Sequence, residues 1–486
     1  MAGDAPGSAF GEASGTPADL DRHGHDCRVP PPATEIQPAL PPGFVLGVTS
    51  SAWQIEGAAD RDGRGPSIWD TFSRVPGAVT TERRADPTGD RAAGHYDRVE
   101  EDVELLRHLG VGAYKFSISW SRVVPEGRGS INRAGLDFYD RLVDRLLNAG
   151  ISPTAALHHW ALPQALEDDG GWLNRATTDA FAEYAAVVAD RLADRVGAWV
   201  PIDAPNVQMM YGYVDGFQAP GWQLGFDALS VAHHLLLGHG HAVAALHAAG
   251  ATQVGCSNHH APMWPASDDE ADVGATKLVD QLWNGLFMEP MLLGRYPVDL
   301  AELMTDLCAP GDLATIRQPL DFYGLSYFRP MKVAATAADE DADVPWKLLL
   351  PLGHDQTESG WAIVPEALRE WLITTRARFR AALPPLVVTE CGASYGTEPD
   401  ASGVVDDTER SAYLAAHLQA VSEAAQRGVD VRGFYAWTFL DGHCWQRGYD
   451  ERLGLVHVDF DTLERTPKAS YDWYASVIAA QTRSVG

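Results

Sequence analysis

Eight short, mostly apolar runs recur along the chain, and each one ends in polar or aromatic residues. The runs cover residues 44–50, 113–119, 152–159, 198–205, 253–259, 321–328, 385–390 and 431–438. Strands that are apolar almost throughout, rather than alternating, are typical of a parallel sheet whose two faces are both covered. The pattern therefore predicts eight buried parallel strands.

Between these runs lie segments with the periodicity of amphipathic helices. Segment 100–110 repeats apolar residues every three or four positions and stops at Gly110, and segments 137–150 and 410–428 repeat the design. Eight strands joined by helices over roughly 440 residues predict an α/β fold, a single (β/α)8 TIM barrel with long βα loops. A doubly wound open sheet is the alternative, but the glycine-rich phosphate loop expected after an early strand is absent from the sequence.

The domain organisation follows from a shift in composition near residue 42. Residues 1–42 are rich in Gly, Ala, Pro and Asp and are predicted to be a flexible N-terminal tail. Residues 43–486 are then one catalytic barrel domain. The stretch HGHDC at 23–27 could ligate a metal, but we favour a solvated tail.

Charge and cysteine content restrict the choice of partners. With 37 Lys and Arg against 66 Asp and Glu, the net charge is −29, which disfavours nucleic acid or an anionic membrane as a partner. Five scattered cysteines without a CxxC pair predict free thiols and a cytoplasmic location. We find no apolar run of about 18 residues and no signal peptide, and the oligomeric state stays open.

In a barrel of this kind, chemistry occurs at the carboxyl ends of the strands. Those ends carry aromatic rings, amides, imidazoles and few carboxylates, for example in HHW at 158–160 and WTFLDGHCW at 437–445. Flat rings beside hydrogen-bonding groups suit a carbohydrate, so the predicted partner is a small-molecule glycoside. Glu390 ends the apolar run PLVVTE, so its carboxylate is expected to face the barrel mouth.

Several motifs in order resemble one family of enzymes. They are SSAWQIEGA, FSISWSRVVP, LHHWALPQALED, DFYGLSYF, TESGW, VVTECG, GFYAWTFLDGHCWQRGY and RTPKASYDWY. From about residue 43 to 478 the chain resembles the family 1 glycoside hydrolases, the β-glucosidase family. The resemblance implies a retaining glycosidase with Glu390 as nucleophile and no cofactor or metal. Such enzymes need a second carboxyl group about 5 to 5.5 Å away as acid and base.

The resemblance also places sugar contacts and exposes departures. By position, the substrate-binding residues are Gln54, Lys115, His159, Trp160, Ser326, Tyr327, Phe328, Trp437, His443, Cys444 and Trp445. The acid/base position holds Ala204, after Asp203 where the family has Asn. Phe328 replaces a Tyr that hydrogen-bonds the nucleophile. Cys444 replaces a Glu that grips the 4- and 6-hydroxyls, which predicts a modified hexose accommodated by Cys444 and His443.

Four accounts of Ala204 stay open. A laboratory substitution could have removed the acid, or the enzyme natively uses activated glycosides, as a hydrolase or a transglycosidase. Asp203 could have taken over proton transfer, although neighbouring strand residues point to opposite faces. The fourth account is a catalytically silent, sugar-binding pseudoglycosidase. A metal hydrolase is disfavoured because His158, His159, His259 and His260 lack a ligand-like arrangement at the strand ends.

Overall fold

The computed structural model describes residues 38–81, 87–337 and 344–485 and contains the predicted barrel. Its strands are β1 (Val45–Ser50), β2 (Ala113–Ser117), β3 (Ser152–His158), β4 (Ala198–Ile202), β5 (Gly255–His259), β7 (Phe322–Ser326), β10 (Leu386–Cys391) and β11 (Val431–Trp437). They pair in parallel in the order β4-β3-β2-β1-β11-β10-β7-β5. Parallel bridges from Trp199 to Val254 and from Asp203 to Ser257 join the two ends of the sheet. The (β/α)8 prediction is confirmed, with all eight strands where the apolar runs placed them.

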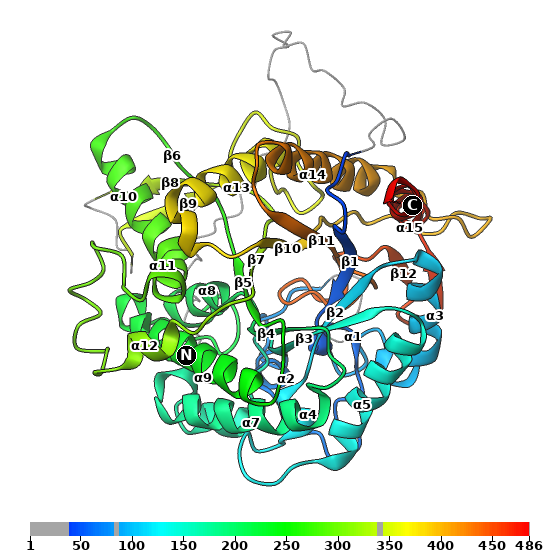
Figure 1. Cartoon of the computed structure of the whole chain (residues 1–486), viewed down its shortest axis with the longest axis horizontal. Coiled ribbons are helices and arrows are strands. Elements are labelled where there is room, and N and C mark those ends of the chain that lie inside the picture. The colour runs from blue at the N-terminus through cyan, green and yellow to red at the C-terminus, as the bar shows by residue number, and fades with distance from the viewer. Residues whose placement is uncertain (1–37, 82–86, 338–343, 486) are drawn as a thin grey trace, which may run out of the picture.

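Helices surround the strands (Figure 1). The longer ones are α3 (Val99–Leu109), α5 (Arg133–Asn148), α7 (Ala176–Leu192), α9 (Leu229–Ala248), α13 (Pro365–Phe379), α14 (Thr408–Gln426) and α15 (Ala469–Val485). The predicted stop at Gly110 is confirmed, since this residue closes α3 at φ 80°, a conformation that costs glycine little. With helices outside and side chains inside, the strands are buried on both faces, which explains their unbroken apolar runs.

Smaller strands in the loops escaped the sequence pattern. β6 (Met263–Pro265), β8 (Met331–Ala335) and β9 (Trp346–Leu349) form one small sheet, and β12 (Val456–Val458) pairs with β13 (Arg465–Pro467). They follow β5, β7 and β11, so they thicken the long loops at the carboxyl end of the barrel. Three to five residues, partly exposed in the first sheet, give too short a pattern to detect.

The segment before β1 contacts the outer helices. The Ala39 carbonyl accepts a hydrogen bond from Ser422 Oγ at 2.8 Å, and the Pro41 carbonyl accepts one from Gln481 Nε2 at 3.1 Å. Most of the predicted tail, including residues 23–27, lies outside the described residues. None of the described helices combines the length and the apolar character needed to cross a bilayer.

Candidate active site

Glu390 lies at the mouth of the barrel, near the end of β10. Its side chain is almost fully buried, and its backbone carbonyl accepts a hydrogen bond from Tyr327 N at 2.9 Å, which ties the end of β10 to the end of β7. A strand-end carboxylate held on a rigid backbone in this way is oriented into the barrel opening. This is the position that the apolar run PLVVTE predicted.

Lys115 of β2 connects Glu390 to a second carboxylate. Its Nζ lies 2.7 Å from Glu390 Oε1 and also forms an ion pair with Asp203. Burial raises the pKa of Glu390 to about 8, an effect that Asp203 reinforces and Lys115 opposes. Burial alone would also raise the pKa of Asp203. The nearby Lys115 and His159 outweigh burial and hold the pKa of Asp203 below its usual range. Asp203 is therefore the ionised partner, and Glu390 retains a proton near neutral pH.

The Asp203 carboxylate has several partners below the opening. Its Oδ1 accepts a hydrogen bond from Ser257 Oγ at 2.6 Å, and its Oδ2 lies 3.6 Å from His159 Nδ1. Burial lowers the pKa of His159 to about 4, so the imidazole is neutral at pH 7. An ionised, fully enclosed Asp203 has no proton to donate at that pH.

Ala204 occupies a tightly held turn between β4 and α8 (Pro205–Val207). Its φ of 41° lies in the left-handed region, which is costly for a residue with a Cβ and persists only when the surroundings enforce it. Its N–H donates to the Ser257 carbonyl at 2.7 Å, and its carbonyl accepts from Trp160 Nε1 at 3.2 Å. Asn206 Nδ2 donates to the His259 carbonyl at 2.6 Å. The backbone is thus built to present a side chain at residue 204, although that side chain is only a methyl group.

Aromatic side chains form one wall of the mouth. The His159 ring lies 5.8 Å from Trp437 and 5.7 Å from Trp445, between ring centroids. Trp160 lies 5.0 Å from Trp445, and Trp445 stacks on Trp53 at 5.2 Å with planes 10° apart. Four residues predicted to contact the sugar are therefore brought together as a continuous aromatic surface.

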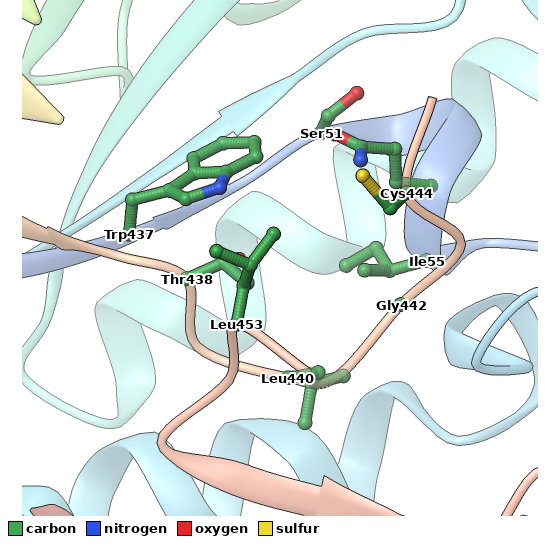
Figure 2. A pocket seen from close by; sticks show the side chains of 9 residues that line it. Ser51, Ile55, Trp437, Thr438, Leu440, Gly442, Cys444 and Leu453 are labelled. Atoms are coloured by element: carbon green, nitrogen blue, oxygen red, sulfur yellow. The ribbon is translucent and has the colours of Figure 1, made fainter. Parts of the chain in front are cut away.

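A small cavity adjoins this wall between β1 and the segment after β11. Figure 2 shows Trp437 and Cys444 on opposite sides of it, and Gln54 also lines it. Gln54 Nε2 donates to the His443 carbonyl at 2.8 Å, while its buried Oε1 has no hydrogen-bond partner in the described part of the chain. The amide oxygen of Gln54 is thus free to accept from a ligand hydroxyl.

Two predicted sugar contacts turn away from the opening. The Tyr327 hydroxyl donates to the Val364 carbonyl at 2.7 Å within the core, and its ring is fully buried. The His443 ring packs 4.9 Å from Trp53, with Nε2 2.8 Å from the Pro87 carbonyl. The motif spacing placed both residues near the sugar, but it could not show which way their side chains point.

The remaining predicted residues lie on the β7 side of the mouth. Ser326 is buried, and its Oγ has no partner among the described residues. Phe328 stacks on His259 at 5.4 Å with planes 15° apart, so it packs against the last residue of β5. Phe328 has no hydroxyl to offer Glu390, and the structure gives that carboxylate Lys115 as its partner.

Sequence reasoning missed a carboxylate beside Cys444. Glu451 Oε2 lies 3.0 Å from Cys444 Sγ, which donates to it, and Glu451 Oε1 accepts from Ser359 Oγ at 2.7 Å. Burial together with Glu451 raises the pKa of Cys444 well above its ordinary value, so the thiol keeps its proton. The wall where the resemblance predicts a Glu at residue 444 therefore carries a carboxylate, supplied seven positions later in the chain.

One cluster at the mouth has the donor atoms of a metal site, but a lysine side chain already supplies the positive charge there. His159, Asp203 and Glu390 offer ligand atoms within 4.8 Å of one another. The Lys115 ammonium already lies between the two carboxylates, so a metal ion would have to displace a buried cation. Of the other histidines considered, His158 hydrogen-bonds Gln208 and His260 hydrogen-bonds Asn284 and Tyr323.

Comparison with known proteins identifies the family and supports the fold. The family described as Glycosyl hydrolase family 1 matches residues 36–483. Beta-glucosidase A of Acetivibrio thermocellus is 39% identical over 445 residues, covering 90% of this chain and 98% of that protein. A bifunctional beta-D-glucosidase/beta-D-fucosidase of Bifidobacterium breve is 39% identical over 465 residues, again covering 90% and 98%. The structure of the psychrophilic beta-glucosidase BglU from Micrococcus antarcticus superposes with a TM-score of 0.86 at 39% identity, covering 91% of this chain and 98% of that one.

The barrel and its mouth define a retaining β-glycosidase architecture. The chain belongs to glycosyl hydrolase family 1, as the family match over residues 36–483 shows. Retaining glycosidases use two carboxyl groups, one as nucleophile and one as acid and base. By sequence position, Glu390 is predicted to be the first of these groups, and Ala204 stands where the second is expected.

Proposed function

We propose that the chain is a retaining β-glycosidase or transglycosidase that acts on activated glycosides, with Glu390 as its nucleophile. The observation that carries the proposal is the contrast at the mouth: Glu390 is present with its Oε1 2.7 Å from Lys115 Nζ, while Ala204 has no group that can transfer a proton. The intact backbone around Ala204 supports a working site from which only the acid is missing.

The first chemical step needs no proton when the leaving group is stable as an anion. One Glu390 carboxylate oxygen attacks the anomeric carbon, and the bond from that carbon to the leaving group breaks. The leaving group departs with the electron pair. Proton donation contributes roughly 10²–10⁴-fold to such a step when the leaving group is basic. Acyl, thio and electron-poor aryl glycosides are therefore the donors that this site can use.

The second step decides between hydrolysis and transfer. A water or an acceptor hydroxyl attacks the anomeric carbon and displaces Glu390, and it must lose a proton on the way. Ala204 cannot accept that proton, so neutral water is a poor acceptor. Acidic or anionic acceptors need no such base, and we therefore propose that the glycosyl-enzyme is long-lived and passes its sugar to them.

The sugar itself depends on the wall formed by Cys444. The loss of a Glu at residue 444 led us to expect a modified hexose. Glu451 Oε2, 3.0 Å from Cys444 Sγ, places a carboxylate at the same wall. We propose that Glu451 accepts the hydroxyls on this side of a hexose, and that a 6-deoxy sugar binds less tightly than its parent.

Intact-protein mass spectrometry after incubation with activated 2-deoxy-2-fluoro glycosides tests the proposal. The expected result is a stable adduct that peptide mapping assigns to Glu390, and the most reactive glycoside identifies the sugar. A sugar-binding protein without activity is the second candidate, favoured by the pKa of about 8 that keeps Glu390 protonated. Tight sugar binding without an adduct from any donor, even at pH 9, would establish that second function.

A further inference from the structure

Arg329 lies three residues after β7, is only partly buried, and differs from the fully buried arginines in its partners. Five guanidinium groups with side chains no more than 7% exposed each lie within 3.2 Å of a carboxylate oxygen. These pairs are Arg64–Asp70, Arg122–Glu56, Arg410–Asp407, Arg452–Asp441 and Arg465–Asp102. Arg329 has no carboxylate within 4.0 Å in the described part of the chain, and the Tyr211 hydroxyl lies close enough to interact with its charge.

The surroundings of Arg329 remove much of its water. Its Cζ lies 5.1 Å from the centroid of the Trp361 ring, a cation–π contact. Burial lowers the pKa of Arg329, although a guanidinium stays charged at any physiological pH. A partly desolvated cation without a carboxylate partner is unfavourable, and a bound anion offsets that cost. Glu451 acts on the charge of Arg329 only through space, because the two groups form no ion pair within 4.0 Å.

Arg329 lies on the side of the mouth where the acid is missing. Its partner Tyr211 belongs to the π-helical segment Gln208–Val214, which continues the turn that begins at Ala204. The neighbouring Phe328 stacks on His259, whose backbone accepts a hydrogen bond from Asn206. Because a proton donor must reach the leaving oxygen, the side of Ala204 is the side of the leaving group.

Aromatic rings beside Arg329 suit a flat ligand. Phe328 and Trp361 meet edge to face at 5.6 Å, and Tyr211 meets Trp283 in the same way at 5.4 Å. We propose that Arg329 binds a carboxylate carried by an aromatic leaving group, so that this enzyme selects glycosides of aromatic acids. The inference rests on the proposed function, since it names the leaving group for the same site.

The binding energies of two matched glycosides test this inference without turnover. The probes are 4-carboxyphenyl and 4-carbamoylphenyl β-D-glucoside, which have nearly the same shape and differ in charge. Titration calorimetry on the full chain is expected to give about tenfold tighter binding of the carboxylate, a preference that declines with added salt. The Arg329→Gln variant is expected to lose this preference while its affinity for the amide changes less than about threefold.

Control variants separate recognition from folding. Arg329→Lys keeps the charge without the planar fork and is expected to keep part of the preference. Arg447→Gln changes a largely exposed arginine, 3.8 Å from Glu451, and is expected to leave the preference unchanged. Circular dichroism and thermal melting of each variant confirm that it is folded.

The two hypotheses fail separately. Equal affinity of the parent chain for both probes, including no binding of either, overturns the carboxylate site, and so does a preference that survives in a folded Arg329→Gln variant. A Glu390 adduct without any preference would leave the glycosidase proposal intact. A preference that depends on Arg329, without an adduct from any donor, would leave the anion site and overturn the glycosidase proposal.

Discussion

The ends of β10 and β4 lie at the same rim of the barrel and are built alike, yet they present different chemistry. Both positions lie at the end of a buried strand, and both are fixed by backbone hydrogen bonds, from Tyr327 N to the Glu390 carbonyl and from Ala204 N to the Ser257 carbonyl. Glu390 carries a carboxylate held by Lys115, whereas Ala204 carries only a methyl group. The difference separates two properties that usually occur together: the scaffold that positions a reacting group, and the group itself.

The β4 end retains the strain of a functional position. A positive φ at a non-glycine residue costs of order 1–3 kcal/mol and is kept by its surroundings, here by bonds to Ser257 and Trp160. The methyl group of Ala204 makes no interaction with the described residues that would explain this backbone cost. Restoring a carboxyl at residue 204 and removing the one at residue 390 are therefore the two experiments that sharpen the comparison most directly.

Glu390→Gln is expected to have the largest effect, because it removes the proposed nucleophile and keeps the shape of the side chain. The release of 2,4-dinitrophenol from an activated glycoside should fall by about 10³-fold or more. Stopped-flow absorbance measures this release, and retention of sugar binding shows that the fold is intact. A variant that keeps the parent rate would move the nucleophile to another residue.

Ala204→Glu is expected to raise hydrolysis of alkyl glycosides, whose leaving groups need a proton, by about 10²–10⁴-fold. Hydrolysis of a dinitrophenyl glycoside should change far less, since its leaving group departs unprotonated. Ala204→Gln is the matched control and should reproduce the parent, because an amide cannot transfer the proton. If the Glu and Gln variants act alike on alkyl glycosides, the role assigned to residue 204 is incorrect.

The sequence predicted the barrel more completely than the site. Buried parallel strands leave unbroken apolar runs, so all eight strands, as well as the location of Glu390 at a strand end, could be found without coordinates. Side-chain directions outside the strands carry no such signal. Nothing in the spacing indicated that Tyr327 turns toward Val364 or that His443 packs on Trp53.

Contacts across loops were also beyond the sequence pattern. Glu451 meets Cys444 because the chain turns back between them, with Cys444 N 2.6 Å from the Gly448 carbonyl. Arg329 meets Tyr211 from a different loop altogether. Contacts of both kinds depend on how irregular segments fold against one another, which hydrophobic periodicity does not encode. Only the charge of Arg329 directly after a strand could have suggested a role at the mouth.

The pH dependence of Glu390 should differ from that of an enzyme with two carboxyl groups. Its pKa of about 8 means that the ionised, nucleophilic form grows as the pH rises. Formation of the glycosyl-enzyme should therefore increase roughly tenfold from pH 7 to pH 9 and then level off. Without a proton donor at residue 204, the profile should have no declining alkaline limb. Adduct formation followed by mass spectrometry gives this profile, and a bell shape would indicate a second titrating group.

The smallest expected effect concerns the carboxylate that stands beside Cys444. Glu451→Gln keeps the size of the side chain and replaces a charged acceptor by a neutral one, which weakens hydroxyl binding by about 1 kcal/mol, or about fivefold in KM for a hexoside. A 6-deoxy hexoside should lose less, because it lacks one of the hydroxyls that this wall receives. Glu183→Gln, on the exposed face of α7, is the matched control. An equal loss for both sugars would show that Glu451 supports the loop around Cys444 rather than the sugar.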